Sequence, residues 1–137
     1  MMSSAVALSL LLLVREFRNQ LPALATDIGY GFQRGTHTRW HMIENDATVA
    51  PTLTDMGASF AIATGGVLTL FIAAAPNRSS VWVPLVDDVS GAVFEQEISA
   101  DLPASTQFLS PRLFMNNGAT AAAVAFDCSG VYVETDY

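Results

Sequence analysis

Residues 67–99 read VLTLFIAAAPNRSSVWVPLVDDVSGAVFEQEIS, and this stretch decides the fold. Short apolar runs at residues 67–73, 81–86 and 92–99 are separated by a Pro-Asn-Arg-Ser-Ser loop and by an Asp-Asp-Val-Ser-Gly turn. The last run is predicted to be a strand in which Val93, Glu95 and Glu97 on one face alternate with Phe94, Gln96 and Ile98 on the other. The stretch therefore predicts antiparallel strands joined by tight turns.

The same signals extend in both directions from this stretch. They predict strands at residues 27–35, 36–44, 48–56, 108–114 and 119–132, with a hairpin turn at residues 116–118. Residues 5–18 form a continuous apolar run that fits a strand or a helix by periodicity, and the strand-rich context favours a strand. Residues 67–73 are apolar on both faces and are predicted to be central in a sheet. Pro84 cannot donate a ladder hydrogen bond, so it predicts an edge or a bulge.

This spacing of strands and turns predicts an all-β fold, an antiparallel β-sandwich or jelly roll. At 137 residues, with no linker dividing it, the chain is expected to be a single domain spanning residues 1–137. Residues 1–25 are expected to form an N-terminal strand or an arm that becomes ordered on assembly.

The composition favours a protein whose surface is partly covered by other subunits. Half of the chain (51%) is hydrophobic and only 14% is charged, so an oligomer or a larger assembly is expected. The net charge is -7, and all six basic residues are Arg, a residue suited to interfaces. Scattered in an acidic chain, they form no basic patch, and nucleic-acid binding is not expected.

The N-terminal apolar run resembles a signal peptide but lacks its charge pattern. No basic residue precedes the run, and Arg15, Glu16 and Arg18 follow it where a cleavage region would lie. The run is also shorter than the roughly 20 residues that span a bilayer. Neither secretion nor membrane insertion is expected. Cys128 has no partner for an intrachain disulfide, and its strand-like surroundings predict a small buried thiol.

The polar constellations favour structural roles over catalysis. In a strand, His37 and His41 would lie on one face about 13 Å apart, too far to share a metal ion. The densest acidic group flanks a predicted turn, where carboxylates commonly hydrogen-bond the backbone; it comprises Asp87, Asp88, Glu95 and Glu97. The aromatic residues that could stack on a sugar are Tyr30, Trp40, Trp82 and Tyr132, although core packing is the commoner use of such residues. We therefore expect no catalytic residue, metal or cofactor.

From Trp40 to its end, the chain resembles small β-sandwich proteins of tailed-bacteriophage and prophage virions. The shared features are Trp40 followed by Asn45-Asp46, and residues 55–60, 75–77, 101–104, 117–120, 123–126 and 131–136. Related sequences are concanavalin-A-like jelly rolls, often terminal domains of tail fibres. The resemblance implies this fold, and it carries over no catalytic or ligand residue.

It also implies a non-enzymatic virion structural protein, a tail or tail-fibre module made in the bacterial cytoplasm and located in the phage particle. Its partners would be other virion proteins and further copies of itself, with a trimer favoured. One alternative is a module that binds a host surface glycan through Trp40, Asn45 and Asp46. A capsid decoration protein of the same fold is another. An enzyme that cleaves polysaccharide would need two acids facing each other across a groove.

Overall fold

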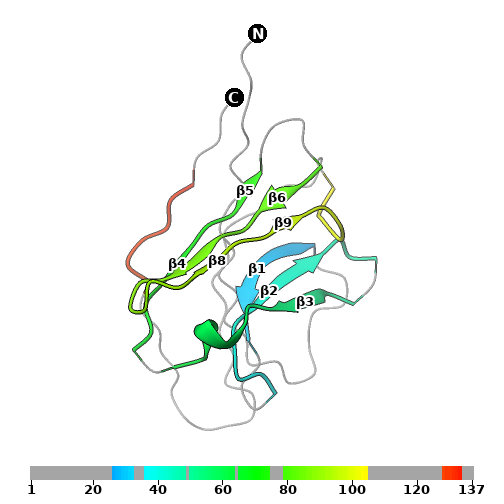
Figure 1. The fold of residues 1–137 in the computed structure, drawn as a ribbon. Coiled ribbons are helices and arrows are strands. Elements are labelled where there is room, and N and C mark those ends of the chain that lie inside the picture. The colour runs from blue at the N-terminus through cyan, green and yellow to red at the C-terminus, as the bar shows by residue number, and fades with distance from the viewer. Residues whose placement is uncertain are drawn as a thin grey trace, which may run out of the picture.

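The computed structural model describes residues 26–32, 36–48, 50–63, 65–74, 79–104 and 128–133. Within these ranges the protein is all-β, as predicted, with antiparallel sheets and one short 3-10 helix (Figure 1). The strands are β1 (Asp27–Gly31), β2 (His41–Asn45), β3 (Thr52–Asp55), β4 (Leu68–Leu70), β5 (Ala73–Ala74), β6 (Val81–Trp82), β7 (Leu85–Asp87), β8 (Val93–Phe94) and β9 (Glu97–Ile98). The helix, η1, spans Ala58–Phe60.

The first sheet has the order β1-β2-β3, with antiparallel neighbours. Its register pairs Tyr30 with Met42 and Ile28 with Glu44. Directly paired residues of an antiparallel sheet share a face, so these four side chains point the same way. Three of them belong to the hydrophobic core, and the fourth is Glu44.

The remaining strands form a single meander whose ladder is interrupted in the middle. Its three segments, residues 68–74, 81–87 and 93–98, pair as β4-β7-β8 at one end and as β5-β6-β9 at the other. Between the two ends, single backbone bonds from Phe71 N to Pro84 O (3.0 Å) and from Val83 N to Gln96 O (2.9 Å) bridge the gap. The ladder breaks at Pro84, because proline has no N–H to donate. The predicted edge or bulge is wrong within the described residues: Pro84 lies in the middle segment, and the pairs Leu70–Leu85 and Ala73–Trp82 keep one register on both sides of it, so no extra residue is inserted.

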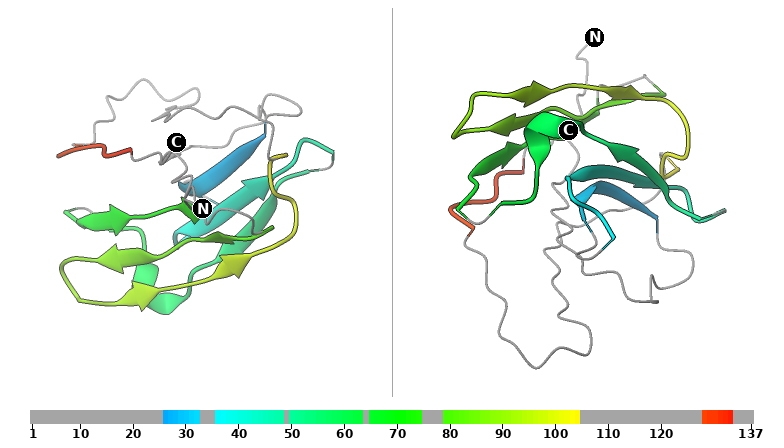
Figure 2. Two further views of the ribbon diagram at one scale, coloured as in Figure 1. Left: turned by 90° about the horizontal axis from the view of Figure 1, so that it is seen from above. Right: turned by 60° about the horizontal axis from the view of Figure 1, so that its bottom comes forward.

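The meander and the β1-β2-β3 sheet share one core, and Figure 2 shows them as two layers. Val83 and Leu85 of the meander are fully buried in the same cluster as Tyr30. The Tyr30 side chain extends from the first sheet to the interrupted part of the meander ladder, where its hydroxyl lies 2.6 Å from Phe71 O and 3.0 Å from Pro84 O. A side chain of the first sheet thus supplies a donor where the meander ladder is interrupted.

The predicted strand at residues 36–44 is only partly correct. β2 begins at His41, and the preceding residues pair with the chain beyond β3: Trp40 N donates to Phe60 O, and Met56 N donates to Trp40 O. Gly57 explains the change, since its φ of 94 is in the left-handed region that turns the chain into η1. The strand predicted at residues 48–56 is likewise shorter, at Thr52–Asp55.

The prediction that residues 67–73 are central in a sheet is wrong. Among the strands that the structure describes, β4 and β5 are each outermost in their sheet, and Phe71 between them is 49% exposed. Apolar residues on both faces suggested burial on both sides, but within the described ranges the outer side is an exposed apolar surface.

Two further predictions at the C-terminal side are wrong. Residues 128–133 form no strand, and Val131, Tyr132 and Val133 are exposed, since none of the ladders that the structure describes includes them. Cys128 is exposed rather than buried, and its thiol lies 3.5 Å from Gly130 O. The strands predicted at residues 5–18 and 108–114, most of that at residues 119–132, and the turn at residues 116–118 lie outside the described residues.

Candidate functional site

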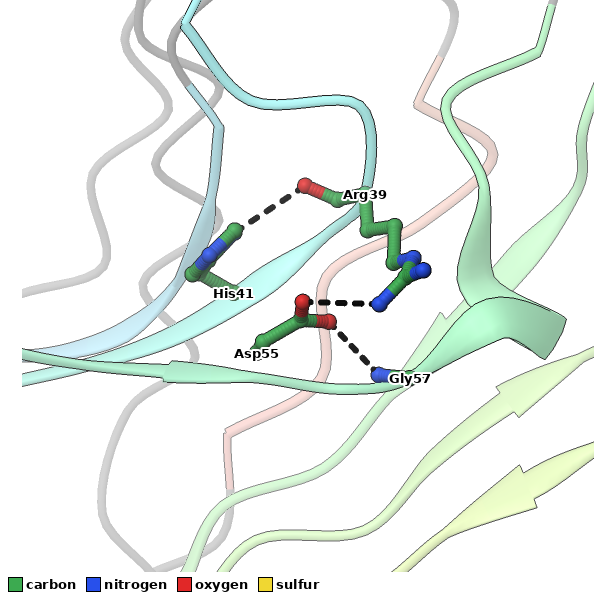
Figure 3. A network of polar contacts seen from close by, with 4 residues as sticks. All are labelled: Arg39, His41, Asp55 and Gly57. Carbon is green, nitrogen blue, oxygen red and sulfur yellow. Dashed lines mark hydrogen bonds and ion pairs between the residues drawn. The ribbon is translucent and has the colours of Figure 1, made fainter.

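A polar cluster lies where β2 and β3 pair near Gly57. Figure 3 shows Asp55 between Arg39 and the backbone of Gly57. Asp55 Oδ2 is 3.0 Å from Arg39 Nη1, and Asp55 Oδ1 accepts a 2.8 Å bond from Gly57 N. The bond to Gly57 N–H is the main cause that lowers the pKa of Asp55, and Arg39 adds to it. The carboxylate therefore holds together the turn that follows β3.

His37 and His41 lie face to face beside this ion pair. Their ring centroids are 4.0 Å apart with an interplanar angle of 26°, so the separation of about 13 Å that a regular strand implies is wrong. The reason is the bend at Thr38, which brings His37 back over His41. His41 Nδ1 lies 3.0 Å from Arg39 O, and because a carbonyl only accepts, this nitrogen carries the proton.

The stacked imidazoles resist protonation at His37. Burial lowers the pKa of His37, with a further contribution from His41, while Asp55 opposes the change by raising it. The folded state therefore binds less proton at His37 than the unfolded chain does. Stability from this group is present above the ordinary histidine pKa and is lost as the pH falls below it.

We expect the two neighbours of His37 to change its titration in opposite directions. Asp55→Asn should lower the titration midpoint of His37 further, because a favourable negative charge is removed. His41→Gln should raise it, because a stacked imidazole is removed. Proton NMR titration of the His37 ring in the three proteins measures this, and shifts of the same sign in both variants would contradict the stacked geometry.

Within the described ranges, no three His, Cys, Asp or Glu side chains gather into a metal-binding group. The histidine pair is therefore a two-residue stack next to an ion pair. Two imidazoles alone are fewer ligands than structural zinc sites use.

The three residues predicted to bind a glycan do not lie together in the structure. Trp40 precedes β2, whereas Asn45 and Asp46 lie at its far end, about 16 Å away at strand rise. Asn45 is buried, and its Oδ1 accepts Ala47 N; Asp46 Oδ1 accepts Thr48 N. These two side chains build the turn after β2. Glycan binding by any of the three stays a prediction, but they cannot line one sugar subsite together.

Trp40 belongs to the packing of the domain. It contacts the hydrophobic core and meets Phe32 edge to face, with ring centroids 4.9 Å apart. Trp40→Ala should lower the free energy of unfolding by about 1–2 kcal/mol, less than for a fully buried aromatic because the side chain is only partly buried. Urea unfolding followed by circular dichroism measures this. Unchanged stability together with lost glycan binding would instead assign Trp40 to a ligand site.

Among the acidic residues of the meander, Asp87 stabilises the turn after β7. Asp87 Oδ1 accepts Val89 N and Ser90 N, and Asp87 Oδ2 accepts the Ser90 hydroxyl, which is the chief cause that lowers the pKa of Asp87. Asp88 accepts the Thr69 hydroxyl. The expected backbone bonding of carboxylates at this turn is thus confirmed at Asp87.

Sequence reasoning missed an exposed apolar surface on the side of the meander away from the core. We call it the outer face; its members are Phe71, Ala73, Trp82, Val93, Glu95 and Glu97. Trp82 is 46% exposed and Val93 55% exposed, and Trp82 pairs across the strands with Ala73 and Glu97. The Ser80 hydroxyl donates to Glu97 Oε1 beside the indole. The alternation of residues 93–98 contained the signal, because it assigns Val93 to the side of Glu95 and Glu97.

A second feature without a strong sequence signal is the burial of Glu44. Its side chain is on the core-facing side of β2, opposite Thr52 on β3, and the residue is 6% exposed. Within the described residues, Glu44 Oε2 has no hydrogen-bond partner. Thr52 bonds instead to Asp101 Oδ2. Burial raises the pKa of Glu44, and Asp101 raises it further.

No protein-family model, curated protein or solved structure matches the chain. Among the residues that the structure describes, no helix has the length and apolar character to cross a membrane.

Proposed function

We propose that this protein is a structural component of a tailed-bacteriophage particle, a module of the tail or tail fibre that acts through protein–protein interfaces without catalysis. The fold proposed for it is an antiparallel β-sandwich of the concanavalin-A-like jelly-roll type. It assembles as a closed homo-oligomer, with a trimer favoured, and binds other virion proteins.

The outer face of the meander is the observation that carries this proposal. Exposed Phe71, Trp82 and Val93 lie on one side of a single three-stranded meander. Large apolar side chains gathered on one face are typical of surfaces that another protein covers. The low charged fraction of the chain, 14%, supports the same reading.

The test is the solution mass of the purified chain, measured by light scattering over a hundredfold range of concentration. A closed oligomer of constant mass is expected. Labelling of purified phage particles with an antibody against the chain tests the virion assignment, with label expected on the tail. A monomer at all concentrations would contradict the homo-oligomer, and particles without label would contradict the virion assignment.

A host-glycan-binding module is the second function that a specific observation favours. Trp82 exposes its ring next to the carboxylate of Glu97 and the hydroxyl of Ser80, a combination suited to a sugar ring. Titration with oligosaccharides should then quench tryptophan fluorescence in the Trp40→Phe variant, and Trp82→Ala in the original chain should abolish glycan binding measured by calorimetry. Absence of quenching by host-surface glycans would count against this second function.

A further inference from the structure

The meander carries no positive charge within its described ranges. Residues 65–74 and 79–104 contain no Lys, Arg or His. Over the same ranges the carboxylates are Asp87, Asp88, Glu95, Glu97 and Asp101. The described part of the meander is therefore acidic, with Arg78 in the β5–β6 loop outside it, and the partner that suits this part is cationic.

On the outer face this charge adjoins the apolar surface. Trp82 is flanked by Ala73, whose side chain ends at Cβ and leaves the neighbouring indole accessible. On the other side it is flanked by Glu97, and Glu95 lies two residues before Glu97 on the same side of the strand. A partner that combines apolar side chains with guanidinium or ammonium groups would satisfy both features, since an indole next to carboxylates also attracts cations to its face.

A second meander does not fit this description. In a two-fold contact the same patch meets itself, so the carboxylates of one copy would face those of the other. Like charges brought together at an interface oppose association. The occupant must therefore come from another part of the assembly.

Residues 5–18 of the chain have the required chemistry. Residues 5–14 are all apolar except Ser9, and the segment ends in Arg15, Glu16, Phe17 and Arg18. In a chain whose basic residues number six, this segment joins two of them directly to its longest apolar run. Arg is also the cation best suited to stacking on an indole and to pairing with a carboxylate.

We propose that residues 5–18 of one copy dock on the outer face of the meander of a second copy. The apolar run contacts Phe71, Trp82 and Val93, and Arg15 and Arg18 pair with Glu95 and Glu97. This inference rests on the proposed homo-oligomer and specifies what holds it together. A contact in which a segment of one copy covers a face of the next is heterologous, and it closes into a ring when the rotation permits, as in a trimer.

A charge-swap experiment in the full-length chain tests the docking. The arm variant is Arg15→Glu/Arg18→Glu, the face variant is Glu95→Arg/Glu97→Arg, and the third protein carries both changes. Sedimentation equilibrium measures the association constant of each, and circular dichroism verifies folding. We expect either variant alone to weaken association by about tenfold or more, and the combined protein to recover to within about threefold of the original chain.

The apolar part of the contact is tested with Trp82→Ser, and Leu53→Ser is the matched control. Leu53 is also an exposed large apolar residue, but it lies on β3 in the other sheet. Association should weaken by about thirtyfold in Trp82→Ser, the scale of a tryptophan at the centre of an interface, and should not change in Leu53→Ser. In the Trp40→Phe background, tryptophan emission should shift to shorter wavelength as concentration rises.

The outcomes separate this inference from the proposed function. A stable oligomer whose mass is unaffected by the arm and face variants would overturn the docking and leave the homo-oligomer intact. Weakening by the face variant alone, or a combined protein that does not recover, would assign the outer face to a different occupant and also overturn it. A chain that is monomeric throughout would contradict the homo-oligomer itself.

Discussion

Replacing Tyr30 by Phe should lower the free energy of unfolding by about 1–3 kcal/mol, although it removes a single oxygen atom. The hydroxyl is fully buried and lies 2.6 Å from Phe71 O. That carbonyl is located where Pro84 interrupts the ladder of the meander. Without the hydroxyl, a partly buried backbone acceptor loses its donor, and the interrupted part of the ladder loses its direct hydrogen bond to the first sheet. Tyr30→Ala, which also leaves a cavity, should cost about 3–5 kcal/mol.

Chemical denaturation of the three proteins measures these losses, and Tyr132→Phe is the matched control. Tyr132 is 78% exposed, so its change should stay within about 0.5 kcal/mol. Burial raises the pKa of Tyr30 well above its ordinary value, so the hydroxyl remains a donor at every pH used for the measurement. If Tyr30→Phe were as stable as the original chain, the hydroxyl would not stabilise the meander where Pro84 interrupts its ladder.

The sequence predicted the features that local chemistry determines. Pro84 was predicted to donate no ladder hydrogen bond, because proline lacks an N–H wherever it is placed, and the ladder breaks there without a bulge. The alternation at residues 93–98 predicted that Val93 and Ile98 lie on opposite faces, and Ile98 is buried while Val93 is exposed. Asp87 was expected at a turn, where its carboxylate bonds the following backbone. Each of these needs only a few neighbouring residues.

Predictions that depended on what covers a strand were wrong. Residues 67–73 and the environment of Cys128 were both judged buried from apolar composition, yet Phe71 and Cys128 are exposed. Composition shows that a side chain tolerates burial, but contacts far away in sequence decide whether it is buried. The stacking of His37 on His41 was missed for a related reason, since it depends on the bend at Thr38.

The candidate site shows the same limit. Trp40 and Trp82 both occur in strand-like runs, so the sequence could not tell which of them is accessible. Trp40 packs against the core, whereas the indole of Trp82 lies on the outer face. The acidic character of the meander was readable from the sequence, but its coincidence with an exposed apolar surface required the strand register.

Replacing Glu44 by Gln should stabilise the protein at pH 8 by about 1–3 kcal/mol, the scale of the penalty on a buried polar group without a partner. Glu44 is 6% exposed, and within the described residues its Oε2 has no hydrogen-bond partner. Burial first, and then Asp101, raise the pKa of Glu44 above its ordinary value. The folded protein therefore binds more proton at Glu44 than the unfolded chain. Stability from this group is fully present below the ordinary glutamate pKa and is lost as the pH rises through the raised one.

Unfolding by urea at intervals between pH 4 and pH 8 measures this dependence. The two proteins should be equally stable near pH 4, where the carboxyl is neutral, and should diverge as the pH rises. Asp88→Asn removes the same charge from an exposed position, and its amide oxygen can still accept the Thr69 hydroxyl, so it controls for the general relief of repulsion in a chain of net charge -7. A gain of equal size in both variants would assign the effect to net charge. A gain confined to Glu44→Gln would show that the core-facing carboxyl opposes folding near neutral pH, and that Thr52 and Asp101 hydrogen-bond each other without compensating for its burial.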